Sequence, residues 1–152
     1  MDKKRIAALA IVLVLTVGYY LYDHSKKTTY EELIADLIGE NEQVERILVY
    51  SDIPYITKSV HTEIKSEALI ERFLTIQMKM KEISTYELPL ITSTMVFETD
   101  QGTYNMGFDG NSVMIGSNRY KITDDYINAV EMILFSENLK WEVTEYTPFD
   151  WH

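Results

Sequence analysis

Few side chains in this sequence stand at spacings that support catalysis or metal binding. The three histidines, His24, His61 and His152, are isolated from one another, and the chain has no cysteine. Zinc sites need clusters of such ligands, so we predict no metal site and no cofactor. The motifs of phosphate loops, dinucleotide folds and hydrolase nucleophile elbows are also absent. The sequence therefore favours a protein without enzymatic activity, and His61 is expected on the exposed side of a strand.

Carboxylates gather near turns in the C-terminal half, where Glu98, Asp100 and Asp109 are followed by Asn111. Oxygen ligands of this kind suit Ca²⁺, but these residues lack the register of a calcium-binding loop. Asp, Gly and Asn are also the residues that tight turns require, so we interpret them as turn residues. An envelope hydrolase using acidic residues stays an alternative, which two converging carboxylates in a concave site with one shifted pKa would reveal.

The strongest pattern is an uncharged run of 17 residues from Ile6 to Tyr22. A helix needs about 17–25 apolar residues to cross a bilayer, so this run predicts one transmembrane helix within an N-terminal segment of residues 1–27. No small-residue cleavage motif follows it, which favours an uncleaved signal-anchor over a cleaved signal peptide. Because residues 3–5 are more basic than residues 26–27, we expect a cytoplasmic N-terminus and an extracytoplasmic domain in a single-pass cell-membrane protein.

Residues 28–152 are enough for one domain and are strongly acidic. They hold 9 basic and 22 acidic residues, which gives a formal charge of −13. Nucleic acid selects a basic face, so no nucleic-acid partner is expected. The absence of cysteine and of N-glycosylation sequons fits a bacterial cell envelope. The expected partners are the membrane, through residues 6–22, and an envelope protein.

Apolar periodicity beyond the anchor predicts one α+β domain with a mainly antiparallel sheet, made of a two-strand unit and a meander and covered by about three helices. Thr28 and Thr29 are followed three residues later by Glu31 and Glu32, which is the spacing of a capping box at the start of the first helix. Gly39 should end this helix in the left-handed conformation. Ser66 should cap the second and longest helix. Helices are expected at 30–38, 66–82 and 123–135, and strands at 44–50, 56–64, 92–99, 103–108, 112–115 and 119–122, with a last strand or extended tail at 139–143.

The order of these elements, together with the stretches 97–104 (FETDQGTY) and 120–122 (YKI), resembles small membrane-anchored or lipid-linked domains of Gram-positive bacteria that are sometimes called YhfM-like. The resemblance covers residues 42–136 and departs from the lipid-linked relatives because the chain has no cysteine. Most such domains have no assigned function. The resemblance implies an extracytoplasmic α+β module of the cell envelope and transfers no catalytic residue.

We therefore predict a membrane-tethered extracytoplasmic binding or regulatory module. Its expected contact residues are Ile53 and Tyr55 in one loop and Phe149 and Trp151 near the C-terminus, because clustered exposed apolar residues mark interfaces. The alternative is that both segments pack down as lids on the core. A further alternative is an immunity-type or accessory protein that pairs with a membrane complex through its anchor. The anchor has neither G-x-x-x-G nor an internal charge, which favours a simple tether.

Overall fold

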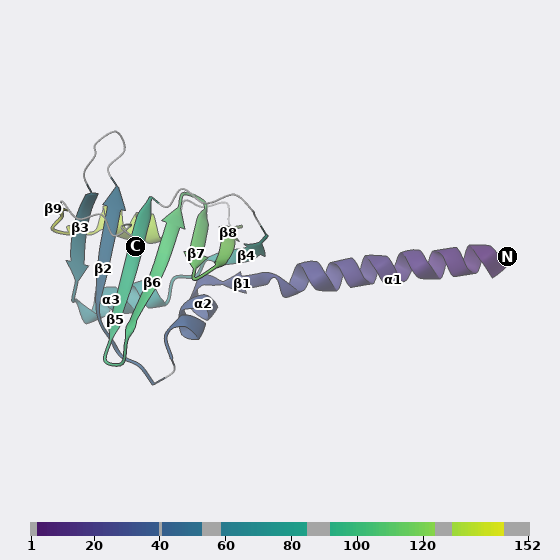
Figure 1. Cartoon of the computed structure of the whole chain (residues 1–152), viewed down its shortest axis with the longest axis horizontal. Helices are drawn as coiled ribbons and strands as arrows, with labels where there is room; N and C mark the ends of the chain where they lie inside the picture. The colour runs from purple at the N-terminus through teal and green to yellow at the C-terminus, as the bar shows by residue number, and fades with distance from the viewer. Residues whose placement is uncertain (1–2, 40, 53–58, 85–91, 124–128, 145–152) are drawn as a thin grey trace.

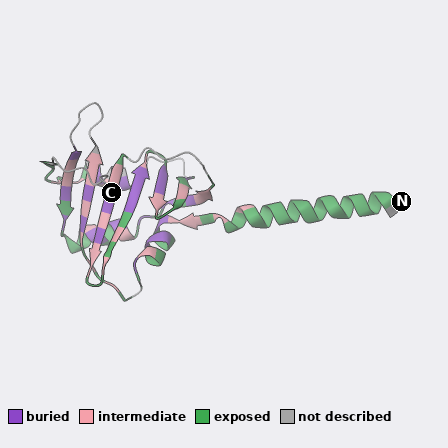
Figure 2. Cartoon of the chain, viewed as in Figure 1, coloured by how far each residue is buried: buried purple, intermediate pink, exposed green. Residues whose placement is uncertain are grey.

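A long helix projects from one edge of an α+β domain in the computed structural model, which describes residues 3–39, 41–52, 59–84, 92–123 and 129–144 (Figure 1). This helix, α1 (Lys3–Ser25), extends three residues beyond the predicted span at each end. Its segment Lys4–Ser25 is long and apolar enough to cross a membrane, and none of it is buried in the molecule. Figure 2 shows this exposure along almost the whole helix.

Nine strands form one antiparallel sheet among the described residues, so the predicted two-strand unit and the meander belong to the same sheet. The order is β1-β4-β8-β7-β6-β5-β2-β3-β9. β2 joins the two parts because it pairs with both β3 and β5. The strands are β1 (Lys27–Thr29), β2 (Val44–Asp52), β3 (Ser59–Ile64), β4 (Lys79–Ile83), β5 (Ser93–Thr99), β6 (Thr103–Asp109), β7 (Ser112–Ile115), β8 (Asn118–Ile122) and β9 (Glu142–Thr144).

The meander from β5 to β8 confirms the prediction from turn residues. Each strand pairs with the next through a short connection. Gly110 and Gly116 have φ angles of 48° and 57°, in the left-handed region that favours glycine. These two turns therefore depend on glycine for their backbone conformation.

Three helices cover one face of the sheet: α2 (Tyr30–Leu37), α3 (Glu67–Leu74) and α4 (Ala129–Ser136). Their buried side chains join those of the strands in one core, so the three helices share a face of the sheet. Figure 1 shows α3 and α4 passing behind the strands. Alternate residues of the strands point into this core, as the sheet pleat requires. The fully buried side chains include Tyr30, Phe73, Phe97, Ile47, Ile64, Met80, Met95, Met106, Val49, Val113 and Val130.

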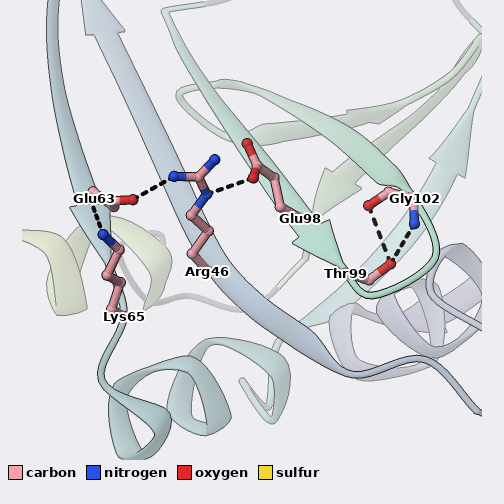
Figure 3. A network of polar contacts seen from close by, with 6 residues as sticks. All are labelled: Arg46, Glu63, Lys65, Glu98, Thr99 and Gly102. Atoms are coloured by element: carbon pink, nitrogen blue, oxygen red, sulfur yellow. Dashed lines mark hydrogen bonds and ion pairs between the residues drawn. The ribbon is translucent and has the colours of Figure 1, made fainter.

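The opposite face of the sheet carries a network of charged side chains at one end. The Arg46 guanidinium donates to Glu98 Oε2 at 2.5 Å and to Glu63 Oε1 at 2.8 Å, and Lys65 Nζ lies 2.8 Å from Glu63 Oε2 (Figure 3). Figure 3 also shows the Thr99 hydroxyl closing the β5–β6 turn against Gly102. The two Arg46 contacts join β2 to β5 and to β3 on the side of the sheet away from the helices.

The predicted helix over residues 66–82 is wrong in its second half. α3 ends at Leu74, and β4 begins at Lys79. Ile76, Met78 and Met80 are buried while Gln77 and Lys79 are exposed, which is the period of an extended segment. Residues 76 and 80 are apolar positions in both the two-residue period of a strand and the helical period, so the apolar pattern alone does not distinguish a strand from a helix here. Ser66 precedes α3, but its side chain makes no capping hydrogen bond.

Gly39 does not end α2 in the left-handed conformation, because Gly110 and Gly116 are the glycines of the described chain with positive φ. Instead, Ile38 is extended, with φ −103° and ψ 120°, and its N–H still donates to the Ile34 carbonyl. The start of α2 confirms the predicted capping box. The Thr29 hydroxyl accepts from the Glu32 N–H, and Glu32 accepts from the Thr29 N–H.

Two short strands lie at the two edges of the sheet. β1 was not predicted, and it begins at Lys27, the last residue of the predicted anchor segment. β9 is the predicted last strand, although it begins only at Glu142, and its Val143 is 62% exposed. The predicted start of the third helix at 124–125 lies outside the described residues.

Candidate functional site

Helices α2 and α3 present matching stripes to a cleft of about 540 Å³. Positions i, i+3, i+4 and i+7 of a helix lie on one face, so each stripe lines one wall. The α2 stripe is Glu31, Ile34, Ala35 and Ile38, and the α3 stripe is Glu67, Ile70, Glu71 and Leu74. The segment between α2 and β2, with Glu42, Gln43 and Val44, and Thr75 after α3 complete the lining.

The floor of the cleft is apolar. Ile34, Ile38 and Ile70 are 4%, 7% and 6% exposed and belong to the domain core. Leu74 and Val44 are half-buried beside them. A ligand seated here would therefore cover aliphatic surface that water partly reaches, at about 25 cal/mol for each Å² removed from water.

The rim of the cleft is acidic. Glu67 and Glu71 are exposed and stand one turn apart on α3. No cation pairs with either glutamate in the described part of the chain. The basic residue next to Glu71 in the sequence, Arg72 on the same helix, pairs with Glu137 instead. Like charges at this spacing destabilise a helix by roughly 0.2–0.5 kcal/mol. A cation bound at the rim would remove that repulsion.

Glu42 contributes a fixed negative charge at the end of the cleft. Its Oε1 accepts from the Tyr104 hydroxyl at 2.6 Å and from the Gly39 N–H at 3.3 Å, and its Oε2 accepts from the Thr99 hydroxyl at 2.7 Å. These bonds, that from Tyr104 above all, hold the pKa of the Glu42 carboxyl below its ordinary value. On the other wall, the Gln77 amide donates to Glu31 and ties α2 to the segment after α3.

Hydrogen bonds stabilise the charged form of four described glutamates, Glu32, Glu42, Glu63 and Glu142, and hold their carboxyl pKa values below the ordinary one. The largest causes are hydrogen bonds from Thr28 to Glu32, Tyr104 to Glu42, Lys65 to Glu63 and Lys140 to Glu142. No group of three or more metal-ligating side chains occurs among the residues that the structure describes.

The four predicted contact residues, Ile53, Tyr55, Phe149 and Trp151, lie outside the described residues, so the docking surface we predicted from them stays a prediction.

The carboxylates that we interpreted as turn residues each have a partner inside the protein. Glu98 pairs with Arg46, and Arg119 pairs with Asp109 at 2.6 Å. Asp100 accepts from the Gln43 N–H at 3.0 Å. Their oxygens therefore stabilise strand ends and turns.

His61 lies on the face of the sheet away from the helices, as a half-buried side chain of β3. Its ring stacks on Tyr50 of β2 with the ring centroids 5.9 Å apart, and its Nδ1 has no hydrogen-bond partner in the described structure. Glu142 stands opposite on β9. These residues form a row across three strands and do not line the cleft between α2 and α3.

The cleft was missed from the sequence because its two walls are 36 residues apart. Each wall has a readable signal, since E-x-x-I-A-x-x-I and E-x-x-I-E-x-x-L share their spacing of acidic and aliphatic residues. No family model matches the chain, and no curated protein and no solved structure is significantly similar to it. The cleft between α2 and α3 is therefore interpreted on its geometry and charge alone.

Proposed function

We propose that this protein is a membrane-tethered extracytoplasmic binding module whose α2–α3 cleft holds a basic, amphipathic segment of an envelope partner. The observation that carries the proposal is the combination of an apolar floor with a rim of glutamates. A segment with aliphatic residues on one side and lysine or arginine beside them matches both features.

The location of the domain is supported by α1. An exposed apolar helix at one edge of the domain is what a single membrane anchor requires. The flanking basic residues favour a cytoplasmic N-terminus, which puts the acidic domain outside the cell.

The two features of the cleft contribute differently to binding. Exposed ion pairs are worth about 0.2–1 kcal/mol each, so the rim selects the sign of the partner more than it adds affinity. The aliphatic floor supplies the larger part of the binding free energy. The predicted partner therefore needs both properties, and a basic segment without apolar residues should bind weakly.

The test uses the full chain in phosphatidylcholine nanodiscs and a fluorescent synthetic amphipathic helix of leucine and lysine as the probe. Fluorescence anisotropy measures binding, with empty nanodiscs as the blank. We expect the Leu/Lys helix to bind and a Leu/Glu helix of the same pattern to stay free. Replacing Glu67→Gln and Glu71→Gln together should weaken binding about 2- to 30-fold, since two exposed pairs are lost.

Two variants make this test specific. Ala35→Lys puts a positive charge on an exposed wall position and should abolish binding without disturbing the core. Asp36→Asn with Glu45→Gln removes the same charge as the rim variant from outside the cleft and should leave binding unchanged. Equal loss in the rim variant and this control would show that only net charge attracts the probe, which contradicts a specific cleft.

A further inference from the structure

Helix α1 joins the domain without a linker. Its last turn is followed by Lys26 and then directly by β1. Asp23 pairs with Lys81 of β4 and lies 3.8 Å from Lys27 Nζ, and the Lys26 carbonyl accepts from the Glu82 N–H at 2.8 Å. Figure 1 shows α1 running straight into the β1 and β4 edge. The position of this edge relative to a membrane that α1 crosses is therefore fixed.

A second cleft, of about 480 Å³, lies at this edge. Three ammonium groups and three hydroxyl groups are among its lining, which consists of Lys27, Thr28, Thr29, Glu32, Lys79, Met80, Lys81 and Thr123. The lysine ammonium groups, which come from β1 and β4, can donate to phosphate oxygens. The Thr28 hydroxyl already donates to Glu32 Oε2, and the Thr123 hydroxyl already donates to the Lys79 carbonyl.

The strand register concentrates positive charge here. Lys27 stands directly opposite Lys81, and Lys81 stands directly opposite Lys121 on β8. Like charges in direct cross-strand register destabilise a sheet. This row occurs in a chain with a formal charge of −10, so it is not a consequence of overall composition. An anion bound along the row would offset the repulsion.

The acidic groups next to the row leave it positive. Asp23 is shared between Lys81 and Lys27. The Glu32 carboxylate caps α2, where it accepts from the Thr29 N–H at 3.0 Å and from the Thr28 hydroxyl at 2.9 Å. Among the described residues, the row of Lys27, Lys81 and Lys121 therefore carries one positive charge more than Asp23 and Glu32 together.

The cleft lies at the level of the lipid headgroups when α1 crosses a bilayer. If residues 6–22 fill the hydrocarbon core, then the headgroup region begins at the last turn of α1 and extends for roughly 5–7 Å. Asp23 lies in that last turn and contacts Lys81 directly. The ammonium groups of β1 and β4 therefore reach the level of the lipid phosphates.

We propose that the cleft between β1, β4 and the start of α2 binds the phosphate of anionic membrane lipids in the leaflet from which α1 emerges. This inference rests on the membrane anchoring in the proposed function. It makes the sheet edge a second membrane contact, which sets how the domain stands on the surface and where the α2–α3 cleft faces.

The test places a fluorophore at Ser84→Cys, an exposed position one residue after β4, in the full chain, which has no other cysteine. Nanodiscs carry a lipid with a nitroxide quencher on its headgroup and contain either phosphatidylcholine alone or phosphatidylcholine with phosphatidylglycerol. We expect stronger quenching in the anionic nanodiscs. Lys27→Gln with Lys79→Gln should abolish that difference, and both side chains are exposed, so the fold should survive.

The matched control is Lys65→Gln with Lys140→Gln, which removes the same charge from exposed lysines outside the cleft and should keep the full lipid-dependent difference. Equal quenching in both lipid mixtures, or equal loss in both double variants, would overturn the inference. Stabilisation of the chain by inorganic phosphate through Lys27 and Lys79, with no response to phosphatidylglycerol, would assign the cleft to a free anion and also overturn it. Failure of anchoring is distinguishable, because quenching would then be absent in every nanodisc.

Discussion

The buried hydroxyl of Tyr30 provides a sharp test of the core. The side chain is fully buried at the start of α2, and its hydroxyl has no hydrogen-bond partner in the part of the chain that the structure describes. Burying an unpaired hydroxyl costs about 1–3 kcal/mol in proteins. Tyr30→Phe removes that cost and leaves the hydrogen bond from the residue 30 N–H to the Met78 carbonyl intact.

The gain should exceed the loss of packing. An emptied volume of roughly 10 Å³ costs about 0.2 kcal/mol at the cavity coefficient of core substitutions. We therefore expect Tyr30→Phe to raise the free energy of unfolding by about 1–2 kcal/mol. Urea titration of the full chain in nanodiscs, followed by tryptophan fluorescence, measures this change.

Tyr104→Phe is the matched control, because it makes the same chemical change where the hydroxyl donates to Glu42 at 2.6 Å. That variant should be less stable than the parent protein, since a hydrogen bond to a charged group is lost. Burial also raises the pKa of Tyr30 above its ordinary value. The parent should therefore lose stability above about pH 10, where the unfolded phenol ionises, and Tyr30→Phe should lose less. If Tyr30→Phe lowered the free energy of unfolding by 1 kcal/mol or more, the inference that the Tyr30 hydroxyl is buried without a partner would be refuted.

Three further predictions concern the core, the cleft and a turn. Phe73→Ala, at a fully buried position of α3, should cost about 3–5 kcal/mol in urea titration, and a cost under about 1 kcal/mol would show that this helix face is not core. Hydrogen bonds hold the pKa of the Glu42 carboxyl below its ordinary value, so the stability that this group contributes is complete above about pH 4.5 and is lost as the pH falls through the lowered pKa. Glu42→Gln should therefore reduce the loss of unfolding free energy at acid pH in urea titrations over a pH series. An unchanged dependence of the unfolding free energy on pH would contradict the hydrogen-bonded Glu42 carboxylate. Gly110→Ala should cost about 1–2 kcal/mol through its φ of 48° alone, since an added Cβ meets nothing within 4 Å, and Gly110→Asn should cost less; equal stability of all three proteins would argue against a left-handed turn.

Elements defined by local chemistry were predictable from the sequence. The capping box of α2 needs only Thr29 and Glu32 at a spacing of three residues, and the meander needs turn residues between short alternating strands. The boundary of α3 was not predictable in this way. Residues 76 and 80 satisfy both periods, and the choice of strand for residues 79–83 depends on pairing with β1 and β8, which are distant in the chain.

Both clefts depend on tertiary contacts for the same reason. The acidic and aliphatic stripes of α2 and α3 can each be read from the sequence, but their juxtaposition results from packing on a shared core. Lys27, Lys81 and Lys121 are scattered along the chain and meet only through the register of β1, β4 and β8. The predicted contact residues Ile53, Tyr55, Phe149 and Trp151 were instead apolar residues close together in the chain, because a groove between two helices cannot be located from local sequence patterns.

The central claim, an acidic domain held outside the cell by α1, is tested most directly by labelling a single cysteine in intact cells. Gln101→Cys puts a thiol in the exposed β5–β6 turn of a chain that has no other cysteine. A membrane-impermeant maleimide should label it without permeabilisation, and the labelled chain should stay in the membrane fraction with its N-terminal residues intact. Labelling only after permeabilisation, or a soluble form that begins near Asp23, would contradict the account.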